Sequence, residues 1–425
     1  MGHYKLPQGW VECQLKDIAT VKGGKRLPAG AKYSESITNY PYIRVTNFEN
    51  MTVNTNDLKY LTPEIKNKIK NYTISKEDIY ISIAGSIGKV GIIPDELDGA
   101  NLTENAAKII HCINKKFLTY ILNSIEIQNQ ISTYTKSTTQ PKLALYRIEE
   151  LKILLPPLNE QRRIVEKIES EFAKIDEGLE HLENAKEQIK QYRQSVLKSA
   201  FSIKNKNEKC LDEITNKIND GTHKTPTYIE KGIPFISVKD IKNKQIFFDN
   251  CKFISEDEHK ILFKRCNPEY GDVLITKSGT IGRTAIVNTD KVFDLFVSVA
   301  LLKPKKDLVT SEFLMYALDN YIAHIDIKQE VKGGVIKNLH IEDLKKITIC
   351  LPPLCKQKKI VEEIEKRFAI ADEVEKVVED NIEKAKQLKQ SILKKAFEGR
   401  LVTQDPTDEP ASTLLEKIKQ ERNKK

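Results

Sequence analysis

The side chains best suited to chemistry in this chain are basic and polar residues on glycine-containing loops, such as Lys22–Arg26 and Gly85–Lys89. Lys and Arg neutralise phosphates, and Arg, Asn and Gln also match the edges of nucleobases. The residue types therefore favour contacts with a polyanion over bond-making chemistry. The candidate contact residues are Lys22, Lys25, Arg26, Arg44, Asn47, Ser86, Lys89, Thr139, Gln140 and Lys142 in the first half, and Thr222, His223, Lys224, Lys239, Ser278, Thr280, Arg283, Lys332 and Lys337 in the second.

The Gly85–Lys89 loop resembles a nucleotide-binding P-loop only superficially. It is too short, and Val90 stands where a Ser or Thr would hold magnesium. Two interpretations remain open. The loop is either a turn at the end of a strand, or a turn that also contacts a nucleic-acid backbone through its N–H groups.

Catalytic and metal-binding patterns are missing from the sequence. The seven histidines form no cluster, and no glycine-rich cofactor loop follows an early strand. Leu155–Leu158 and Leu351–Leu354 read Leu-Pro-Pro-Leu, which differs from the Asn/Asp-Pro-Pro-aromatic motif of amino-methyltransferases. Asp78 and Asp272 each open a strand without a Glu-x-Lys partner, so a turn role is expected. We expect no catalytic residue, no metal site and no cofactor in this chain.

The composition indicates a folded protein of two or three domains. The chain has 425 residues, of which 40% are hydrophobic and 30% charged, and no apolar run reaches the ~18 residues that span a bilayer. The first residues lack the apolar core of a signal peptide, so the cytoplasm is expected. The seven cysteines include no Cys-x-x-Cys pair, and we expect free, mostly buried thiols.

Most of the net charge of +9 lies on two segments. Residues 1–155 carry 20 basic and 15 acidic residues, and residues 204–350 carry 24 and 21. This excess permits a nucleic-acid partner, although charge alone would fit a merely soluble basic protein equally well.

An internal repeat organises the whole chain. The segments 155–201 and 351–397 match without a gap at an offset of 196 residues, and a block of roughly 150 residues precedes each of them. Their apolar residues recur in steps of three and four, which predicts two long helices with coiled-coil seams. The predicted seams are Ile164, Ile168, Phe172, Ile175, Leu179, Leu182, Ala185, Ile189, Tyr192 and Val196, and Ile360, Ile364, Phe368, Ala371, Val374, Val378, Ala385, Leu388 and Ile392.

Strand and turn signals divide the chain into five parts. We expect a globular domain at 1–154, a spacer helix at 155–203, a second domain at 204–350, a second spacer helix at 351–400, and a tail with a short helix at 401–425. Tyr42–Phe48, Asp78–Ile83, Ile236–Ile241 and Asp272–Lys277 read as strands, and Pro63 begins a helix capped by Thr62. The loops of the two domains differ although their frameworks recur.

The short connection between the first helix and the second domain predicts how the helices pair. A helix of about 43 residues is about 64 Å long, whereas a compact block of this size is about 30 to 40 Å across. The second helix must therefore run back along the first as an antiparallel pair with a pseudo-two-fold relation. The alternative is that a second chain supplies the partner helix.

The repeated Leu-Pro-Pro-Leu helix start, the Gly-(Ser/Thr)-Ile-Gly turn and the ending Ala396–Val402 resemble the specificity subunits of Type I restriction–modification systems. The resemblance covers essentially the whole chain, although Cys355 and Lys356 depart from the usual pair. It implies an α+β fold in which two α/β target recognition domains are separated by a long antiparallel two-helix coiled coil.

The resemblance also implies a function. Each domain would read one half of a bipartite, asymmetric double-stranded DNA target, and the helices would set the unread spacer. The helices would also dock two modification (methyltransferase) subunits that bind S-adenosylmethionine, and restriction subunits that use ATP and magnesium would join them. A coiled-coil scaffold whose globular blocks bind protein is the second hypothesis, and a fused modification–specificity enzyme is the third.

Overall fold

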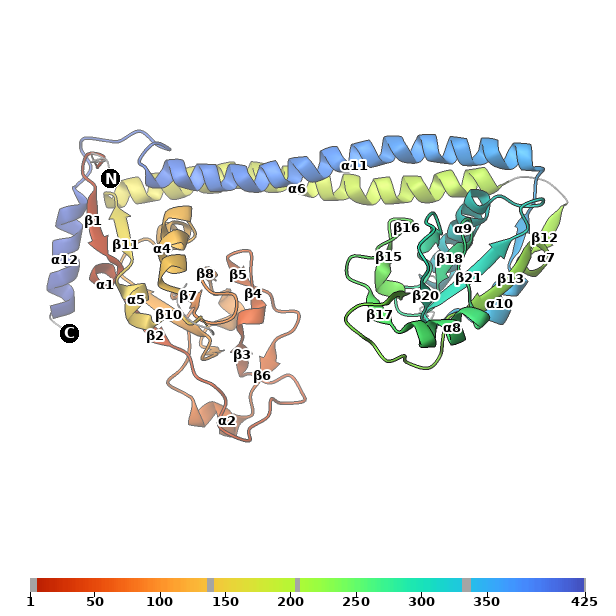
Figure 1. Ribbon diagram of the computed structural model, residues 1–425. Coiled ribbons are helices and arrows are strands. Elements are labelled where there is room, and N and C mark those ends of the chain that lie inside the picture. The colour runs from red at the N-terminus through yellow and green to blue at the C-terminus, as the bar shows by residue number, and fades with distance from the viewer. Residues whose placement is uncertain (1–5, 136–140, 203–206, 331–337, 424–425) are drawn as a thin grey trace. The chain divides into compact units, whose positions relative to one another are not determined.

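The structure is a computed structural model that describes residues 6–135, 141–202, 207–330 and 338–423 (Figure 1). It divides into two compact units. The first unit comprises Met1–His181 and Asn381–Lys425, and the second comprises Leu182–Asp380. Each unit contains one globular domain and a part of both long helices, α6 (Leu158–Phe201) and α11 (Leu354–Phe397).

A four-stranded antiparallel sheet forms the centre of the first unit. Its order is β2-β10-β7-β8, and the strands are β2 (Ala19–Gly23), β10 (Ala106–His111), β7 (Ile79–Ser82) and β8 (Val90–Ile92). The helices α1 (Leu15–Ile18), α3 (Lys115–Leu122), α4 (Ile125–Thr135) and α5 (Leu145–Glu149) share a core with this sheet. All four residues of β7 are buried.

Smaller sheets complete the first domain. β3 (Pro41–Ile43) lies between β6 (Lys59–Tyr60) and β9 (Asn101–Leu102), and its pairing with β9 is parallel. β4 (Phe48–Glu49) and β5 (Thr52–Val53) form a hairpin, and β1 (Val11–Gln14) pairs with β11 (Lys152–Leu155). The strand predicted at Tyr42–Phe48 is therefore too long, because the chain turns into a 3-10 helix at Val45–Asn47.

The helix predicted after Thr62 is present as α2 (Pro63–Lys68). The Thr62 hydroxyl accepts a hydrogen bond from the Ile65 N–H at 3.4 Å, which satisfies one of the free donors at the helix start. Asp78 also has the predicted turn role, because its carboxylate accepts the Ser75 N–H at 2.9 Å. Asp272 accepts the Glu269 N–H in the same way at 2.8 Å.

The second unit repeats this framework. The sheet order β13-β21-β18-β19 corresponds to β2-β10-β7-β8, and β17-β14-β20 corresponds to β6-β3-β9. The strands of these two sheets are β13 (Thr215–Asp220), β21 (Val299–Pro304), β18 (Val273–Thr276), β19 (Thr284–Ile286), β17 (Lys252–Ile254), β14 (Ile233–Ile236) and β20 (Asp294–Leu295). In addition, β12 (Glu208–Cys210) pairs with β22 (Thr348–Cys350), and β15 (Ile241–Lys242) pairs with β16 (Gln245–Ile246).

The helices of the second domain are α7 (Leu211–Ile214), α8 (Glu256–Arg265), α9 (Ser311–Glu330) and α10 (Ile341–Lys346). The strand predicted at Ile236–Ile241 ends early, as in the first unit. A 3-10 helix occupies Val238–Asp240, and the Asp240 carboxylate accepts the Ser237 N–H at 2.8 Å.

The two long helices of the chain pair with each other and run antiparallel, as predicted. In the second unit, Lys186 Nζ lies 3.0 Å from Glu379 Oε1, and Arg193 Nη1 lies 2.7 Å from Asp372 Oδ1. The partner number falls as the α6 number rises, which defines the antiparallel direction. In the first unit, Lys389 of α11 pairs with Asp176 of α6.

The helix contacts of one unit recur in the other at residues shifted by 196. Lys389 lies 4.9 Å above the Phe172 ring in the first unit, and Arg193 lies 5.6 Å above the Phe368 ring in the second. Edge-to-face pairs recur as well, with ring centroids 5.8 Å apart for Tyr120–Phe172 and for Tyr316–Phe368. The duplication therefore repeats specific contacts as well as the fold.

The predicted seam is wrong at one position of α6 and at two positions of α11. Leu388 is 51% exposed and Tyr192 is 43% exposed, so neither belongs to the buried seam. The following residues, Lys389 and Arg193, turn toward the partner helix instead, because their aliphatic stems pack and their cationic ends lie over phenylalanine rings. Val374 is also exposed, at 46%.

The other predicted seam residues are buried or half-buried. Ile164, Ile168, Phe172, Ile189 and Val196 of α6 and Ile364, Ala371, Val378 and Ile392 of α11 are buried. Half-buried positions are Ile175, Leu179, Leu182, Ala185, Ile360, Phe368 and Ala385.

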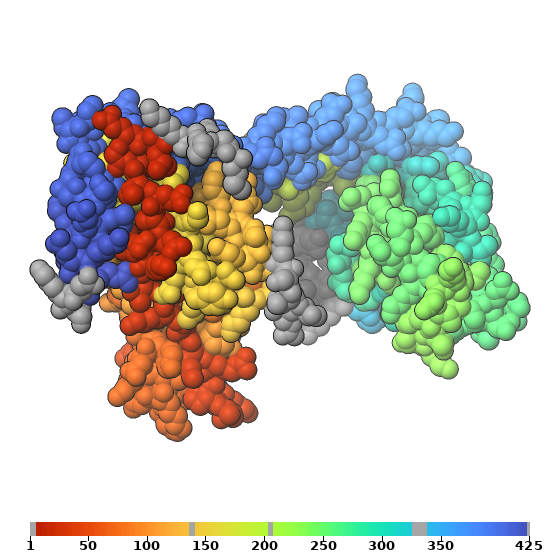
Figure 2. Space-filling model, turned by 60° about the vertical axis from the view of Figure 1, so that its left-hand side comes forward, coloured from red at the N-terminus to blue at the C-terminus, as the bar shows by residue number. Residues whose placement is uncertain are grey.

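The tail forms a helix, α12 (Ala411–Asn423), that packs on the start of the chain within the first unit. Arg422 donates hydrogen bonds to the Lys16 carbonyl and, at 2.9 Å, to Thr20 Oγ1. Figure 2 shows this blue helix against the red N-terminal segment. The indole of Trp10 donates to the buried Glu160 carboxylate at 3.0 Å, beside the Arg163–Asp408 ion pair of the tail.

Fewer of the seven cysteines are buried than predicted. Cys13, Cys251 and Cys266 are buried, Cys210 and Cys350 are half-buried, and Cys112 and Cys355 are exposed. Burial raises the pKa of Cys13 and of Cys266 to about 12. Across the part of the chain that the structure describes, no helix is both long and apolar enough to cross a membrane.

Candidate nucleic-acid interface

One end of the central sheet gathers several loops of the first unit. β2 and β7 end there and β10 begins there, because Gly23 pairs with Ala107 and Ser82 with Ala106. Beyond the strands, the Lys25 N–H donates to the Leu102 carbonyl at 2.8 Å, and the Ile83 N–H to the Asn105 carbonyl at 2.8 Å. We call this surface the first loop edge, and it comprises residues 22–26, 83–86, 103–106 and 141–143.

Glycine is required where these loops approach most closely. A Cβ on Gly24 would lie 2.0 Å from the Thr103 carbonyl oxygen, and a Cβ on Gly221 in the second unit would lie 1.9 Å from the Leu295 carbonyl oxygen. Any side chain at either position would therefore displace backbone. These two glycines occupy equivalent places in the two domains.

Basic side chains are exposed along the first loop edge. Four of the proposed contact residues are exposed there: Lys22, Lys25, Arg26 and Lys142. Arg26 Nε donates to Glu104 Oε1 at 2.8 Å, and Thr103 Oγ1 holds the other carboxylate oxygen at 2.9 Å. Burial raises the pKa of Glu104, but the hydrogen bonds, with that from Arg26 the largest of them, outweigh burial and hold its pKa below the ordinary value.

The Gly85–Lys89 segment is the turn of the hairpin between β7 and β8. Ser82 Oγ donates to the Ser86 carbonyl at 2.5 Å and accepts the Lys89 N–H at 2.8 Å. Thr276 Oγ1 makes the matching bonds in the second unit, to the Thr280 carbonyl at 2.6 Å and from the Arg283 N–H at 2.9 Å. A strand follows the turn, whereas a P-loop requires a helix.

Three candidates of the first unit hold the framework together. Asn47 is buried, and its side-chain Oδ1 accepts the Arg44 N–H at 3.0 Å. Arg44 pairs with Asp57 at 2.8 Å, and Lys89 Nζ donates to the Phe48 carbonyl at 2.9 Å. Ser86 is exposed in the turn. Thr139 and Gln140 lie outside the described residues.

The second unit has an equivalent surface, the second loop edge, which comprises residues 220–224, 277–280, 295–299 and 338–339. The Thr222 N–H donates to the Leu295 carbonyl at 3.0 Å, and the Lys277 N–H to the Ser298 carbonyl at 2.8 Å. The backbone pattern thus matches that of the first loop edge, although the side chains differ.

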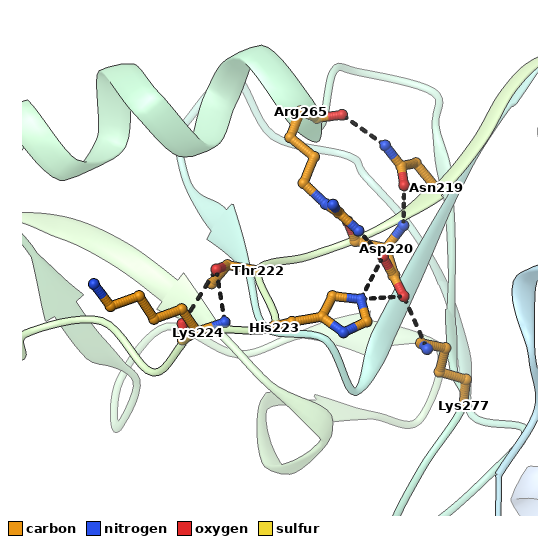
Figure 3. A network of polar contacts seen from close by, with 7 residues as sticks. All are labelled: Asn219, Asp220, Thr222, His223, Lys224, Arg265 and Lys277. Atoms are coloured by element: carbon orange, nitrogen blue, oxygen red, sulfur yellow. Dashed lines mark hydrogen bonds and ion pairs between the residues drawn. The ribbon is translucent and has the colours of Figure 1, made fainter.

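A buried carboxylate organises the second loop edge (Figure 3). The Asp220 side chain is 4% exposed and lies 2.9 Å from Lys277 Nζ and 2.7 Å from Arg265 Nη2. His223 Nε2 lies 3.2 Å from the same carboxylate. Burial raises the pKa of Asp220, but the hydrogen bonds from Lys277 and Arg265 outweigh burial, so its pKa lies below the ordinary value.

The remaining candidates of the second unit have different roles. His223, Lys224, Lys239 and Thr280 are exposed, Ser278 is half-buried, and Thr222 is buried in a turn with Lys224. Arg283 is a tether, because its guanidinium donates to the Ile241 carbonyl at 3.3 Å as Lys89 does to Phe48. Lys332 and Lys337 lie outside the described residues.

Four charged residues that lie at the loop edges or pair with them were not predicted from the sequence. Glu104, Asp220, Arg265 and Lys277 form the carboxylate–cation pairs, and no local motif marks them. Arg265 ends a helix that lies 45 residues from Asp220 in sequence. The only local sequence signal for these pairs is that a charged residue, Lys277, directly follows the buried strand Val273–Thr276.

The arrangement suits recognition of an anion. Exposed cations line both loop edges, and carboxylates hold some of them in fixed positions. Within the described residues, no group of three His, Cys, Asp or Glu side chains is placed to hold a metal ion.

Comparison with known proteins identifies the same architecture elsewhere. The family model described as the Type I restriction modification DNA specificity domain matches the chain twice, at residues 7–191 and 203–384. The Type I restriction enzyme EcoBI specificity subunit of Escherichia coli is 27% identical over 459 residues, which cover 99% of this chain and 94% of that protein. The EcoKI specificity subunit, also of Escherichia coli, is 27% identical and covers 98% and 96%.

A solved structure from work on "complex assembly and conformational transition of the type I R-M system" has the same fold. It aligns with a TM-score of 0.67 at 21% sequence identity, covering 93% of this chain and 100% of the other. The twofold match to the family model covers most of the chain. This chain therefore belongs to the family of Type I restriction–modification DNA specificity proteins.

Proposed function

We propose that this chain is the DNA-reading subunit of a Type I restriction–modification complex and that each globular domain reads one half of a bipartite target. The loop edges would enter the major groove, where side-chain donors meet base edges. Because the two edges carry different side chains on one framework, the half-sites would differ and the target would be asymmetric. The chain itself would contribute recognition and no catalysis.

One observation carries this proposal. The two domains share backbone contacts at their loop edges, including the close approach at Gly24 and at Gly221, while Arg26–Glu104 in one is replaced by Asp220–Lys277–Arg265 in the other. A framework that is repeated and a surface that is varied are what two readers of different sequences require.

The helix pair would act as a spacer between the two half-sites and as a docking surface for two modification (methyltransferase) subunits. Those subunits would bind S-adenosylmethionine and methylate a flipped adenine, and restriction subunits would use ATP and magnesium. The names of the similar proteins support membership of such a complex, which would act on double-stranded DNA in the cytoplasm.

The test is binding of the purified chain, together with its modification subunits, to a pool of duplexes over a series of salt concentrations. We expect the affinity for every duplex to fall as the salt concentration rises, because phosphate contacts release counterions. Binding at high salt should persist only for duplexes of one sequence class.

The rival hypothesis is a scaffold whose globular blocks bind protein. It predicts equal, weak affinity for every duplex at each salt concentration. That result would overturn the proposal, because a reader must bind its own sequence more tightly than others.

A further inference from the structure

The arginine at the end of α8 is held in a fixed position at the second loop edge. Arg265 Nη2 donates to Asp220 Oδ1 at 2.7 Å, and its main-chain carbonyl accepts the Asn219 amide at 2.9 Å. The side chain is nevertheless 49% exposed. Both the backbone and the guanidinium of this residue are therefore attached to the end of β13, while half of the side chain faces solvent.

The carboxylate that holds Arg265 cannot itself face an anion. Asp220 is 4% exposed, and Lys277, which is 6% exposed, pairs with it at 2.9 Å from the inner side. Lys277 neutralises the negative charge of Asp220. Without this cation, burying the ionised carboxylate would cost a large desolvation free energy. Arg265 is then a second cation on one carboxylate, so the cluster keeps an excess positive charge at the surface.

The guanidinium has donors to spare. Arginine carries five N–H donors, and the contacts with Asp220 involve Nη2 and, at 3.5 Å to the main-chain oxygen, Nε. The Nη1 donors and the second Nη2 hydrogen remain to form a fork. Such a fork matches O6 and N7 of guanine in the major groove, and a preset fork loses little entropy on binding.

The first unit contains the same device built from different residues. Arg26 donates through Nε to Glu104 at 2.8 Å, and its side chain is 78% exposed. Because this hydrogen bond uses Nε, both terminal nitrogens of Arg26 can donate to a ligand. Each loop edge thus has one exposed arginine that donates to a carboxylate from a segment distant in sequence.

We propose that Arg265 reads a guanine in the half-site of the second domain and that Asp220 is the positioning residue that aims it. This inference rests on the proposed function and extends it by naming a residue and the base that it recognises. Lys277 has no place in direct reading, because its side chain is 6% exposed and pairs with Asp220.

The test uses the full chain in complex with its modification subunits. The target is first mapped with the wild-type complex, and competitor duplexes are then made that change one base pair of the second half-site at a time. In wild type, changing one G·C pair should weaken competition by roughly 10- to 100-fold through loss of the bidentate contact. In Arg265→Met this penalty should fall to about 1-fold, while the penalties at other positions stay unchanged.

Lys264→Met is the matched control, because Lys264 is an exposed cation on the same helix. It should leave the pattern of penalties as in wild type, whatever it does to affinity. Asp220→Asn alone would destabilise the protein, because Lys277 would stay buried without its carboxylate partner. We therefore combine Asp220→Asn with Lys277→Met, which removes both buried charges. This double variant should lose the same G·C penalty as Arg265→Met although Arg265 is present.

Two results would overturn the inference. In the first, Arg265→Met binds every duplex equally less well with an unchanged pattern of penalties, which assigns Arg265 to a phosphate. In the second, Arg265→Met leaves both the affinity and the pattern unchanged. Failure of the underlying function looks different, because the wild-type complex itself would then show no base-pair penalties at all.

Discussion

Single residues at the loop edges are fixed by charge pairing across loops that are distant in sequence. Asp220 receives Lys277 from the end of β18 and Arg265 from the end of α8. Breaking a buried pair by removing one partner is costly, because the remaining charge has lost its compensation. The network should therefore contribute to stability as well as to recognition.

Asp220→Asn should lower the free energy of unfolding of the second unit by about 3 kcal/mol at pH 7, because Lys277 stays charged and buried. Urea unfolding followed by circular dichroism measures this change. The control is Asp57→Asn, since Asp57 is 70% exposed and water screens its ion pairs with Arg44 and Lys59, so this substitution should destabilise the protein far less. Equal effects of the two substitutions would contradict the role of burial.

The pH dependence of stability has a definite sign at Asp220. Its folded pKa lies below the ordinary value of about 3.9, so the unfolded chain binds its proton first as pH falls. The stabilisation is present above the unfolded pKa and is lost as pH falls through the folded pKa. The slope of unfolding free energy against pH below about pH 4 should be smaller in Asp220→Asn, and an unchanged slope would argue against this linkage.

The sequence indicated which loops meet at the two edges but not which residues would be paired. Lys22, Lys25, Arg26 and His223 were proposed from residue type and loop position, and all four are exposed at a loop edge. Their contact with DNA stays a prediction. Asn47, Lys89 and Arg283 were chosen by the same rule, yet they donate to or accept from nearby backbone. Residue type alone does not distinguish a donor that tethers a hairpin from one that faces solvent.

At the scale of elements, the long helices were predicted almost completely because their apolar period is sustained over the whole repeat. The error at Tyr192 and Leu388 has a physical cause. A search for apolar residues misses Arg193 and Lys389. The aliphatic part of each side chain packs like an apolar residue, and the cationic end contacts a phenylalanine ring and pairs with an aspartate. Parallel pairing of β3 with β9 could not be predicted, because nothing local encodes it.

Leu388→Ala should change the unfolding free energy by less than about 0.5 kcal/mol, because Leu388 is 51% exposed. Ile392→Ala, one turn further along α11 and 8% exposed, should cost about 2 to 5 kcal/mol. Chemical unfolding of the two variants, monitored by the fluorescence of Trp10 in the same unit, compares them directly. A cost at Leu388 similar to that at Ile392 would restore Leu388 to the seam.

Gly178→Ala should raise the unfolding free energy by about 1 kcal/mol. Gly178 lies inside α6, and a Cβ there would meet no atom within 4 Å, so alanine gains helix propensity without a clash. Gly88→Ala is the contrast, because Gly88 has φ +87° and its Cβ would lie 2.7 Å from Gln128 Oε1. That variant should be less stable than wild type in the same thermal unfolding measurement.

At the scale of the whole molecule, each unit repeats the contacts of the other. Asp176–Lys389 and Asp372–Arg193 are the same pair in the two copies. The register of the helices is therefore specified once in each unit. The duplication could be found in the sequence because the helices match without a gap and the strand patterns of the domains recur loosely, whereas the matching backbone contacts at the loop edges are seen only in the structure.

A paired deletion tests the spacer role of the helices. Removing residues 179–185 from α6 and 380–386 from α11 keeps the Asp176–Lys389 and Lys186–Glu379 pairs in register. Seven residues correspond to about 10 Å of helix, or about three base pairs of DNA. We expect the unread spacer to shorten by roughly that amount with both half-sites unchanged, and an unchanged spacer would refute the role as a ruler.

One chain that reads two different half-sites at a set separation should leave a defined pattern of methylation. Genome-wide mapping of methylated adenines, in cells that express this chain with its modification subunits, reveals that pattern. We predict a single asymmetric target with two specified parts and an unspecified spacer of constant length. A target specified without interruption, or one with two identical halves, would contradict the account.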